Sequence, residues 1–169
     1  MTKKILFLII IIVSFSVSQQ LFRSNTYGFE VTFPDKWEVK EGTTTMVAVV
    51  AKYGDYSSIN IVVKENESIG NVTIEDINLE KFKDDLVMKY QSAFTNFKMV
   101  DYGKTTINYN NAIYFTYYCD IVDKILKAKQ YFMFNNSRMY VISTGCLDSE
   151  AADYDSMFND CVNSYKFTN

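Results

Sequence analysis

Apolar and polar residues alternate along the segment 27–37, whose sequence is Tyr-Gly-Phe-Glu-Val-Thr-Phe-Pro-Asp-Lys-Trp. The two sets are Phe29, Val31 and Phe33 on one parity, and Glu30 and Thr32 on the other. This period of two predicts the first strand of a sheet, with the apolar set facing a core. Pro34 ends the strand, because its ring restricts φ and it has no amide hydrogen for a central ladder. We therefore expect a strand, a turn and a buried Trp37.

Further runs with a period of two follow this segment. They are residues 46–52, residues 58–63 and a long stretch over 98–142, which turn sequences at 110–111 and 135–137 divide. Gly54 and Asp55 supply a turn between the first two runs, as expected for a hairpin. In the longest strand one parity holds Ile113, Phe115, Tyr117, Cys119 and Ile121. We therefore predict a sheet built mainly from hairpins.

Two segments change to the helical spacing of i, i+3 and i+4. The first covers 74–94 and follows a possible capping box of Thr73 and Asp76, and the second follows Asp148 or Ser149 as a cap. Their apolar stripes are Leu79, Phe82, Leu86, Tyr90 and Ala93 in the first helix, and Ala151, Tyr154, Phe158, Cys161 and Tyr165 in the second. Strands, helix, strands and helix joined by hairpin-length links predict an α+β fold with a mainly antiparallel sheet.

The first 18 residues have the three parts of a secretory signal peptide. Lys3 and Lys4 precede an apolar run over 5–13, and small residues follow up to Ser18. This run is shorter than the ~20 residues that a membrane-spanning helix needs. We therefore predict a signal peptide at 1–18 that is cleaved before Gln19, a single domain over 19–169, and a secreted or periplasmic protein without a membrane span after cleavage.

Charge and residue types exclude several function classes. The chain has 17 Lys+Arg and 20 Asp+Glu, so losing Lys3 and Lys4 changes the net charge from −3 to −5. A mildly acidic chain without basic runs does not favour a nucleic-acid partner. The chain has no histidine, which removes the Ser-His-Asp and Cys-His nucleophile systems and the common zinc-hydrolase ligand sets. We expect no enzyme activity, no metal and no cofactor.

The three cysteines are Cys119, Cys146 and Cys161. In an exported protein a disulfide is permitted, and Cys146 with Cys161 is the best pair, because one ends a strand and the other lies on the buried stripe of the next helix. Closing this loop of about 15 residues would stabilise the fold by ~3 kcal/mol. Cys119 is then a buried free thiol, since a strand should separate it from Cys146.

Two groups of polar residues suggest sites only weakly. The acidic cluster Asp148, Glu150, Asp153 and Asp155 could bind a cation, but its spacing fits no EF-hand loop, and acidic residues are favoured in a first helical turn. Three Asn-x-Ser/Thr sequences begin at Asn66, Asn71 and Asn135. They would be glycosylated only in a eukaryotic host, and three matches are close to chance in a chain this rich in Asn, so we interpret them as loop markers.

The segment 27–37 resembles the F-x-(I/V)-x-(Y/F)-P-x-x-W start of PsbP-like domains. The remaining order agrees over 25–168: a hairpin, one long helix, a turn at 110–112, a late strand at 138–142, and a closing helix that runs into the Ser-Tyr-Lys-Phe of 164–167, like the family's S-F-x-F. The resemblance implies an α/β/α sandwich with a mainly antiparallel sheet flanked by helices. It implies no activity, because this PsbP/DcrB-like superfamily has differing functions and no catalytic motif.

These observations favour an exported, non-enzymatic accessory or binding protein with a protein partner in the cell envelope or outside the cell. Tyr114 and Tyr118 have the parity opposite to the apolar set of their strand, so they either form an aromatic surface or lie beneath a helix. One alternative is a carrier of a small apolar ligand or lipid in a cavity between helix and sheet. Another is a hydrolase that uses only carboxylates, which would need two of them in one concave site.

Overall fold

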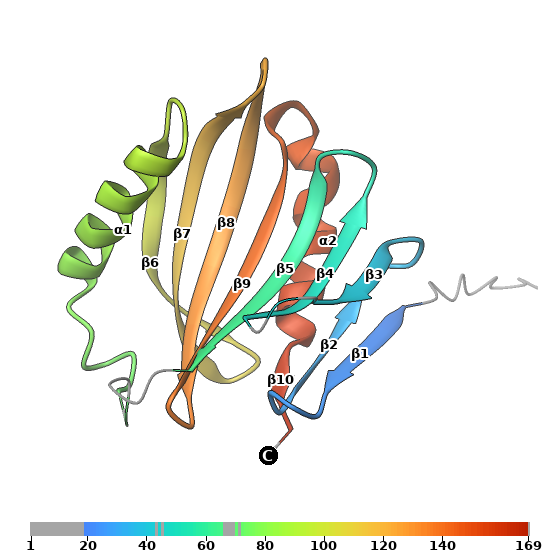
Figure 1. Ribbon diagram of the computed structural model, residues 1–169, viewed down its shortest axis with the longest axis vertical. Helices are drawn as coiled ribbons and strands as arrows, with labels where there is room; N and C mark the ends of the chain where they lie inside the picture. Colours follow the sequence, from blue (N-terminus) through green and yellow to red (C-terminus); the bar gives the residue numbers. More distant parts are fainter. Residues whose placement is uncertain (1–18, 43, 45, 66–69, 71, 169) are drawn as a thin grey trace, which may run out of the picture.

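The computed structural model describes residues 19–168 except residues 43, 45, 66–69 and 71 (Figure 1). The predicted signal peptide at 1–18 lies outside the described residues, as do the glycosylation acceptors Asn66 and Asn71. None of the helices in the described part of the chain combines the length and the apolar character that spanning a bilayer requires.

The chain forms two antiparallel sheets. The larger has seven strands in the order β3-β4-β5-β9-β8-β7-β6, and the smaller has three in the order β1-β2-β10. The strands of the larger sheet are β3 Glu38–Glu41, β4 Val47–Tyr53, β5 Ser57–Glu65, β6 Lys98–Ile107, β7 Asn110–Ile121, β8 Lys124–Asn135 and β9 Arg138–Leu147. Those of the smaller sheet are β1 Gln20–Ser24, β2 Phe29–Phe33 and β10 Lys166–Phe167. Every pair of neighbours is antiparallel. The hairpin-length links predict this for consecutive strands, whereas β5–β9 and β2–β10 join strands that are distant in sequence.

The two helices lie on opposite sides of the larger sheet (Figure 1). Helix α1, Leu79–Ala93, packs on one face, and helix α2, Ala151–Ser164, packs on the other together with the smaller sheet. The expected α+β class and antiparallel sheet are confirmed. The expected sandwich with helices on both faces is confirmed only in part. On one face of the larger sheet, the outer layer consists of α2 and the smaller sheet together, and among the described residues each face carries a single α-helix.

Helix α1 begins later than the sequence pattern predicts. The side chain of Asn78 caps it by accepting a hydrogen bond from the Lys81 amide at 3.0 Å. The amide and hydroxyl of Thr73 both donate to the Asp76 carboxylate, at 2.9 and 2.8 Å, but they close a separate turn before the helix. The predicted stripe is confirmed from Leu79 to Tyr90, whose residues pack against the sheet, but its last member, Ala93, is exposed.

Strand β2 holds the apolar set that the sequence assigned to a core, and Phe33 is its last residue before Pro34. It is not the first strand, however. Strand β1 precedes it and pairs with one edge, and β10 from the carboxyl end of the chain pairs with the other. Burial alternates along β1, but the residue types do not follow it, because the apolar Leu21 is exposed and the polar Ser24 is buried.

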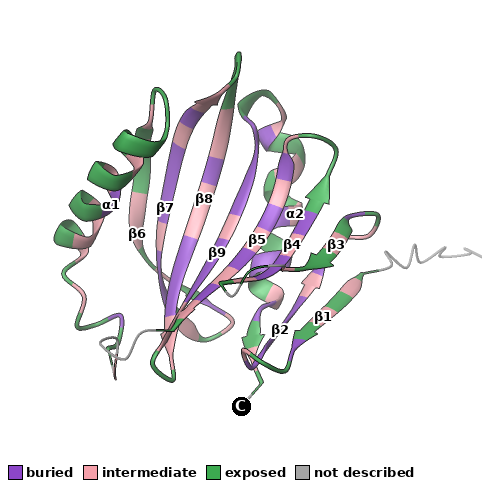
Figure 2. Cartoon of the chain, viewed as in Figure 1, coloured by how far each residue is buried: buried purple, intermediate pink, exposed green. Residues whose placement is uncertain are grey.

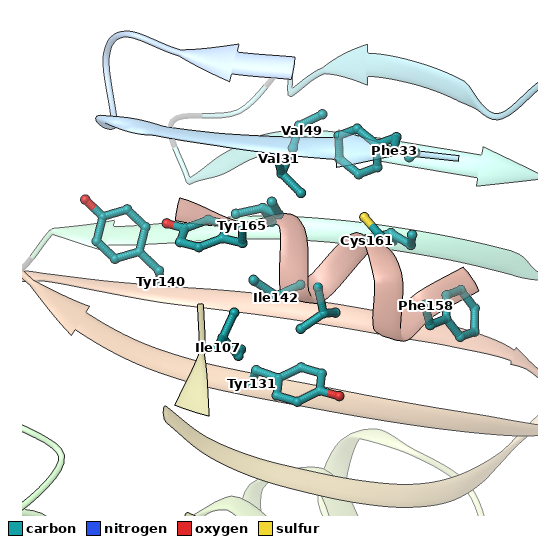
Figure 3. Packing of buried hydrophobic residues seen from close by; sticks show 14 of the residues in the cluster. Val31, Phe33, Val49, Ile107, Tyr131, Tyr140, Ile142, Phe158, Cys161 and Tyr165 are labelled. Carbon is teal, nitrogen blue, oxygen red and sulfur yellow. The ribbon is translucent and has the colours of Figure 1, made fainter. Parts of the chain in front are cut away.

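The core lies between β2, α2 and the larger sheet (Figure 3). Trp37 is only 3% exposed there and stacks on Tyr53 with ring centroids 5.9 Å apart. Its ring also meets Phe158 of α2 edge-on at 6.0 Å. Phe29 of β2 stacks on Tyr165, which follows α2, at 5.3 Å. These aromatic contacts attach the beginning and the end of the folded chain to one core. Figure 2 shows the buried residues in purple.

Glu30 corrects the expected parity of β2, because it is buried at 6% exposure instead of facing solvent. In register, Arg23 of β1 and Lys166 of β10 stand opposite Glu30. Both contact its carboxylate at 2.6 Å. The hydrogen bonds from Lys166 and then from Arg23 hold the pKa of this carboxyl below its usual range. One buried carboxylate therefore joins all three strands of the smaller sheet.

We expect Trp37→Ala to lower the free energy of unfolding by ~3–5 kcal/mol, as truncation of a buried aromatic side chain does. Chemical denaturation monitored by circular dichroism measures this difference. Tyr109→Ala is the matched control, because Tyr109 is 99% exposed in the β6–β7 turn. Equal stability of the Trp37 variant and the native protein would contradict the assigned core.

We expect Glu30→Gln to lower the melting temperature at pH 7. A carboxyl whose pKa is lowered on folding stabilises the fold above its unfolded pKa, and this stabilisation is lost as pH falls through the folded pKa. The difference from the native protein should therefore shrink below about pH 4. Melting curves between pH 7 and pH 2.5 measure it, with Glu41→Gln in the exposed strand β3 as control. A difference that stays constant over this range would show that the ion pairs do not act.

Candidate functional site

Neither face of the larger sheet is fully covered. Six strand spacings of about 4.8 Å make the sheet about 29 Å wide, whereas a helix with its side chains is about 10–12 Å across. Helix α2 and the smaller sheet pack mainly over β4, β5 and β9, and α1 packs mainly over β6, β7 and β8. A depression beside each helix follows from this diagonal arrangement.

The depression beside α2 is a polar groove of about 340 Å³, which we call the α2 groove. Its floor is the part of β6–β9 that α2 leaves uncovered, and α2 itself is one wall. The lining residues are Val100, Asp101, Thr116, Tyr118, Lys127, Ala128, Lys129, Tyr131, Thr144, Cys146, Asp155, Phe158 and Asn159.

Antiparallel register sets the floor of this groove in rows. Thr116 of β7 stands opposite Lys129 of β8, which stands opposite Thr144 of β9. The adjacent row places Tyr118 opposite Lys127 in the same way. Because residues two apart in a strand share a face, the two rows lie on the α2 side of the sheet together.

Lys129 is held by aromatic rings. Its ammonium lies 4.7 Å from the ring centroid of Tyr114 and 5.2 Å from that of Tyr131, within the range of cation–π attraction. Burial raises the pKa of Tyr131 to about 12. Within the part of the chain that the structure describes, Lys129 forms no ion pair. Its side chain is thus oriented, and its charge is not neutralised by a direct carboxylate contact.

Gly103 makes room for the ring of Tyr114. A Cβ atom at residue 103 would come within 3.0 Å of that ring, so the ring lies over the glycine backbone. From there the Tyr114 hydroxyl reaches the Asp101 carboxylate at 3.4 Å. Burial, followed by the charge of Asp101, raises the pKa of Tyr114. Gly103 thus determines the position of the Tyr114 ring, which with the Tyr131 ring forms what we call the Lys129 cradle.

The wall that α2 contributes is charged. Lys127 of the floor approaches the Asp155 carboxylate of α2 at 3.4 Å, which spans the groove where helix and sheet meet. Asp155 and Asn159 are exposed and one helical turn apart, so they present polar atoms on the same side of α2. The groove therefore contains two lysines from β8, one aspartate from β6 and one aspartate from α2.

Tyr114 and Tyr118 neither form the exposed aromatic surface nor lie fully beneath a helix, which were the two arrangements that the sequence left open. Both are half-buried: Tyr114 packs against the edge of the main core, and Tyr118 lines the α2 groove. Helix α2 is too narrow to cover them fully, and they do not form an open aromatic surface. Parity located them on this face, but the position of α2 decided their exposure.

The structure does not show the predicted Cys146–Cys161 disulfide, because Cys119, Cys146 and Cys161 are all free and buried. Cys146 lies on β9 and lines the α2 groove. In Figure 3 the sulfur of Cys161 is on the side of α2 toward Phe33 of the smaller sheet. Both cysteines belong to one core, as the pattern indicated, but the sequence does not say toward which sheet each side of α2 turns. The pairing stays a prediction.

The acidic cluster near the start of α2 is divided among different surfaces. Asp155 lines the α2 groove, and Asp153 lines a wider depression of about 890 Å³ between β2 and α2. Asp148 lines a separate pocket beside the start of β8 and the end of β9. Among the described residues, no three His, Cys, Asp or Glu side chains are grouped so that they could hold a metal ion.

A second groove lies beside α1 on the opposite face and has a volume of about 350 Å³. We call it the α1 groove. Its apolar lining residues are Val62, Phe82, Leu86, Phe132, Met139 and Val141. Lys64, Asp85 and Lys89 are also among the residues that line it. This groove differs from the α2 groove in having mostly apolar side chains.

Comparison with known proteins gives a family and a fold. A family model described as "PsbP-like protein" matches residues 8–167. No curated protein sequence matches the chain. The solved structure of cyanobacterial PsbP (CyanoP) from Synechocystis sp. PCC 6803 is similar with a TM-score of 0.71 and 13% identity, covering 89% of this chain and 93% of that one.

Two other solved structures share the fold. LpqN of Mycobacterium tuberculosis, described as involved in cell envelope biogenesis, has a TM-score of 0.59 and 13% identity, covering 90% of this chain and 91% of LpqN. PA94 of Pseudomonas aeruginosa, described as a putative regulator of unknown function, has a TM-score of 0.51 and 12% identity, covering 86% and 94% of the two chains. At these identities the likeness concerns the fold alone.

The structure has three free cysteines, so we expect the thiols to react slowly with maleimide in the folded protein. Reaction of all three after denaturation without reductant would contradict the predicted Cys146–Cys161 disulfide. Burial raises the pKa of Cys146 to about 11 and that of Cys161 to about 12, so little reactive thiolate is present at pH 8. Mass spectrometry counts the modified thiols. A single reactive thiol in the denatured protein would instead identify a disulfide between Cys146 and Cys161.

Proposed function

Because this chain belongs to the PsbP-like protein family, we propose that it is an exported, non-enzymatic accessory or binding protein. It acts on a partner in the cell envelope or outside the cell, and the α2 groove is its binding site. The observation that carries this proposal is the cradle of Lys129, which is oriented by two tyrosine rings without a carboxylate contact.

An oriented but unpaired cation is typical of a binding surface. Holding a lysine side chain in one place costs conformational entropy, which a solvent-exposed lysine avoids. Here the rings of Tyr114 and Tyr131 offset that cost before a ligand arrives. A partner then gains a charge-assisted hydrogen bond without ordering the side chain itself. The description of LpqN as involved in cell envelope biogenesis agrees with an envelope role.

A non-enzymatic role is supported by how the reactive groups of the groove are engaged. The Cys146 thiol is buried with a raised pKa, which disfavours a nucleophilic thiolate. The Asp155 carboxylate contacts Lys127, and the Asp101 carboxylate accepts a hydrogen bond from Tyr114. Both carboxylates of the groove are therefore already engaged by neighbouring side chains.

The alternative function is a carrier of a small apolar ligand or lipid, and the α1 groove favours it. This groove lies between helix and sheet and is lined mainly by apolar side chains. A carboxylate-only hydrolase is the third and weakest candidate, with Asp101 and Asp155 as the carboxylates that share one groove. Asp101→Asn and Asp155→Asn would abolish any hydrolysis of this kind.

A photo-crosslinking amino acid placed at Tyr118 tests the binding role in the native envelope fraction. We expect it to capture one reproducible partner, because Tyr118 lines the α2 groove. The same amino acid at Tyr109, which is 99% exposed in a turn at the end of β6, is the matched control and should not capture that partner. No capture from Tyr118, or equal capture from both positions, would contradict the proposal.

A further inference from the structure

The charges of the α2 groove cancel, which restricts the ligands that fit it. Lys127 and Lys129 supply two positive charges, and Asp101 and Asp155 supply two negative charges. An anionic ligand that fills the groove would meet the two aspartates, and a cationic ligand would meet the two lysines. An apolar ligand would remove all four groups from water without new partners, which is costly. A neutral polar ligand avoids these three penalties.

The hydrogen-bonding groups of the groove are equally mixed. Lysine ammonium groups only donate, and aspartate carboxylates only accept. Hydroxyl and amide side chains do both, and the groove contains Thr116, Tyr118, Thr144 and Asn159 of that kind. A ligand that pairs with all of these groups needs many atoms that both donate and accept. Hydroxyl groups on neighbouring carbons have this property.

Aromatic side chains line the same groove. Tyr118 is half-buried on the floor, Tyr131 is buried beside Lys129, and Phe158 of α2 is buried in the wall. The C–H face of a sugar ring packs against such rings, while its hydroxyl groups point to the polar atoms around them. The groove volume of about 340 Å³ is at the small end of the ~300–1,000 Å³ range of ligand sites.

We propose that the α2 groove binds a neutral saccharide of one or two rings. Lys129 donates a hydrogen bond to one of its hydroxyl groups, Asp155 accepts one from another, and Tyr118 packs against a ring face. This inference rests on the proposed binding role and names the chemical class of ligand for the same site. It requires no charge on the saccharide.

Titration of the ¹⁵N-labelled protein with maltose, cellobiose and N,N′-diacetylchitobiose tests this assignment. We expect at least one of the three to shift the amide signals of Tyr118, Lys127 and Asn159. Lys129→Met should weaken that binding about tenfold, because one charged hydrogen-bond donor is lost. Lys64→Met in the α1 groove is the matched control and should leave binding unchanged. Asn159→Ala, on the exposed side of α2, should also weaken binding without affecting folding.

Three results would overturn the saccharide assignment. The first is no groove shift with any of the three disaccharides. The second is a groove shift with glutamine or glycine betaine alone, which would identify a zwitterionic ligand. The third is saccharide binding that neither Lys129→Met nor Asn159→Ala weakens. If crosslinking from Tyr118 still captures a partner in such a case, the binding role stands and only the ligand class fails.

Discussion

The width of the seven-stranded sheet controls the rest of this structure. A sheet of about 29 Å cannot be covered on either face by one helix of about 10–12 Å. The described residues form two α-helices, one for each face, and the smaller sheet adds cover only beside α2. The uncovered parts lie diagonally opposite each other. They become the polar α2 groove and the more apolar α1 groove.

The smaller sheet explains why α2 has a definite position. Its strand β2 presents Phe29, Val31 and Phe33 to the core, and its other side is tied together by the buried carboxylate of Glu30. Strand β10 follows α2 directly and joins β2, so the end of the helix is fastened to the beginning of the folded chain. The wall of the α2 groove is therefore placed by contacts on the opposite side of α2.

The groove combines residues that are distant in sequence. Register between β7, β8 and β9 brings Thr116, Lys129 and Thr144 into one row, and Gly103 of β6 gives the Tyr114 ring its place. Because these positions depend on backbone pairing, the floor is rigid in comparison with a loop-built site. The balance of charges results from α2, which adds Asp155 to a floor that contains Lys127 and Lys129.

The sequence predicted those parts of the fold in which local spacing reflects burial. The α+β class, the antiparallel hairpins, the stripe of α1 and the buried Trp37 follow from periods of two and 3.6. The turn at 136–137 was predicted because Asn tolerates positive φ. The turn between β6 and β7 lies at Asn108 and Tyr109, whereas the sequence predicted it at Asn110. The prediction was wrong by two residues because a tyrosine gives no turn signal.

The sequence alone determined the family resemblance, the periodicity of the strands and helices, and the parity that places Tyr114 and Tyr118 on the face opposite the apolar set. The tertiary structure decided what covers each face. It placed Cys161 on the side of α2 toward the smaller sheet, buried Glu30 between two cations, and brought Lys129 into a groove with Asp155. The physical reason is that periodicity records whether a side chain is buried, whereas a site depends on which distant element buries it.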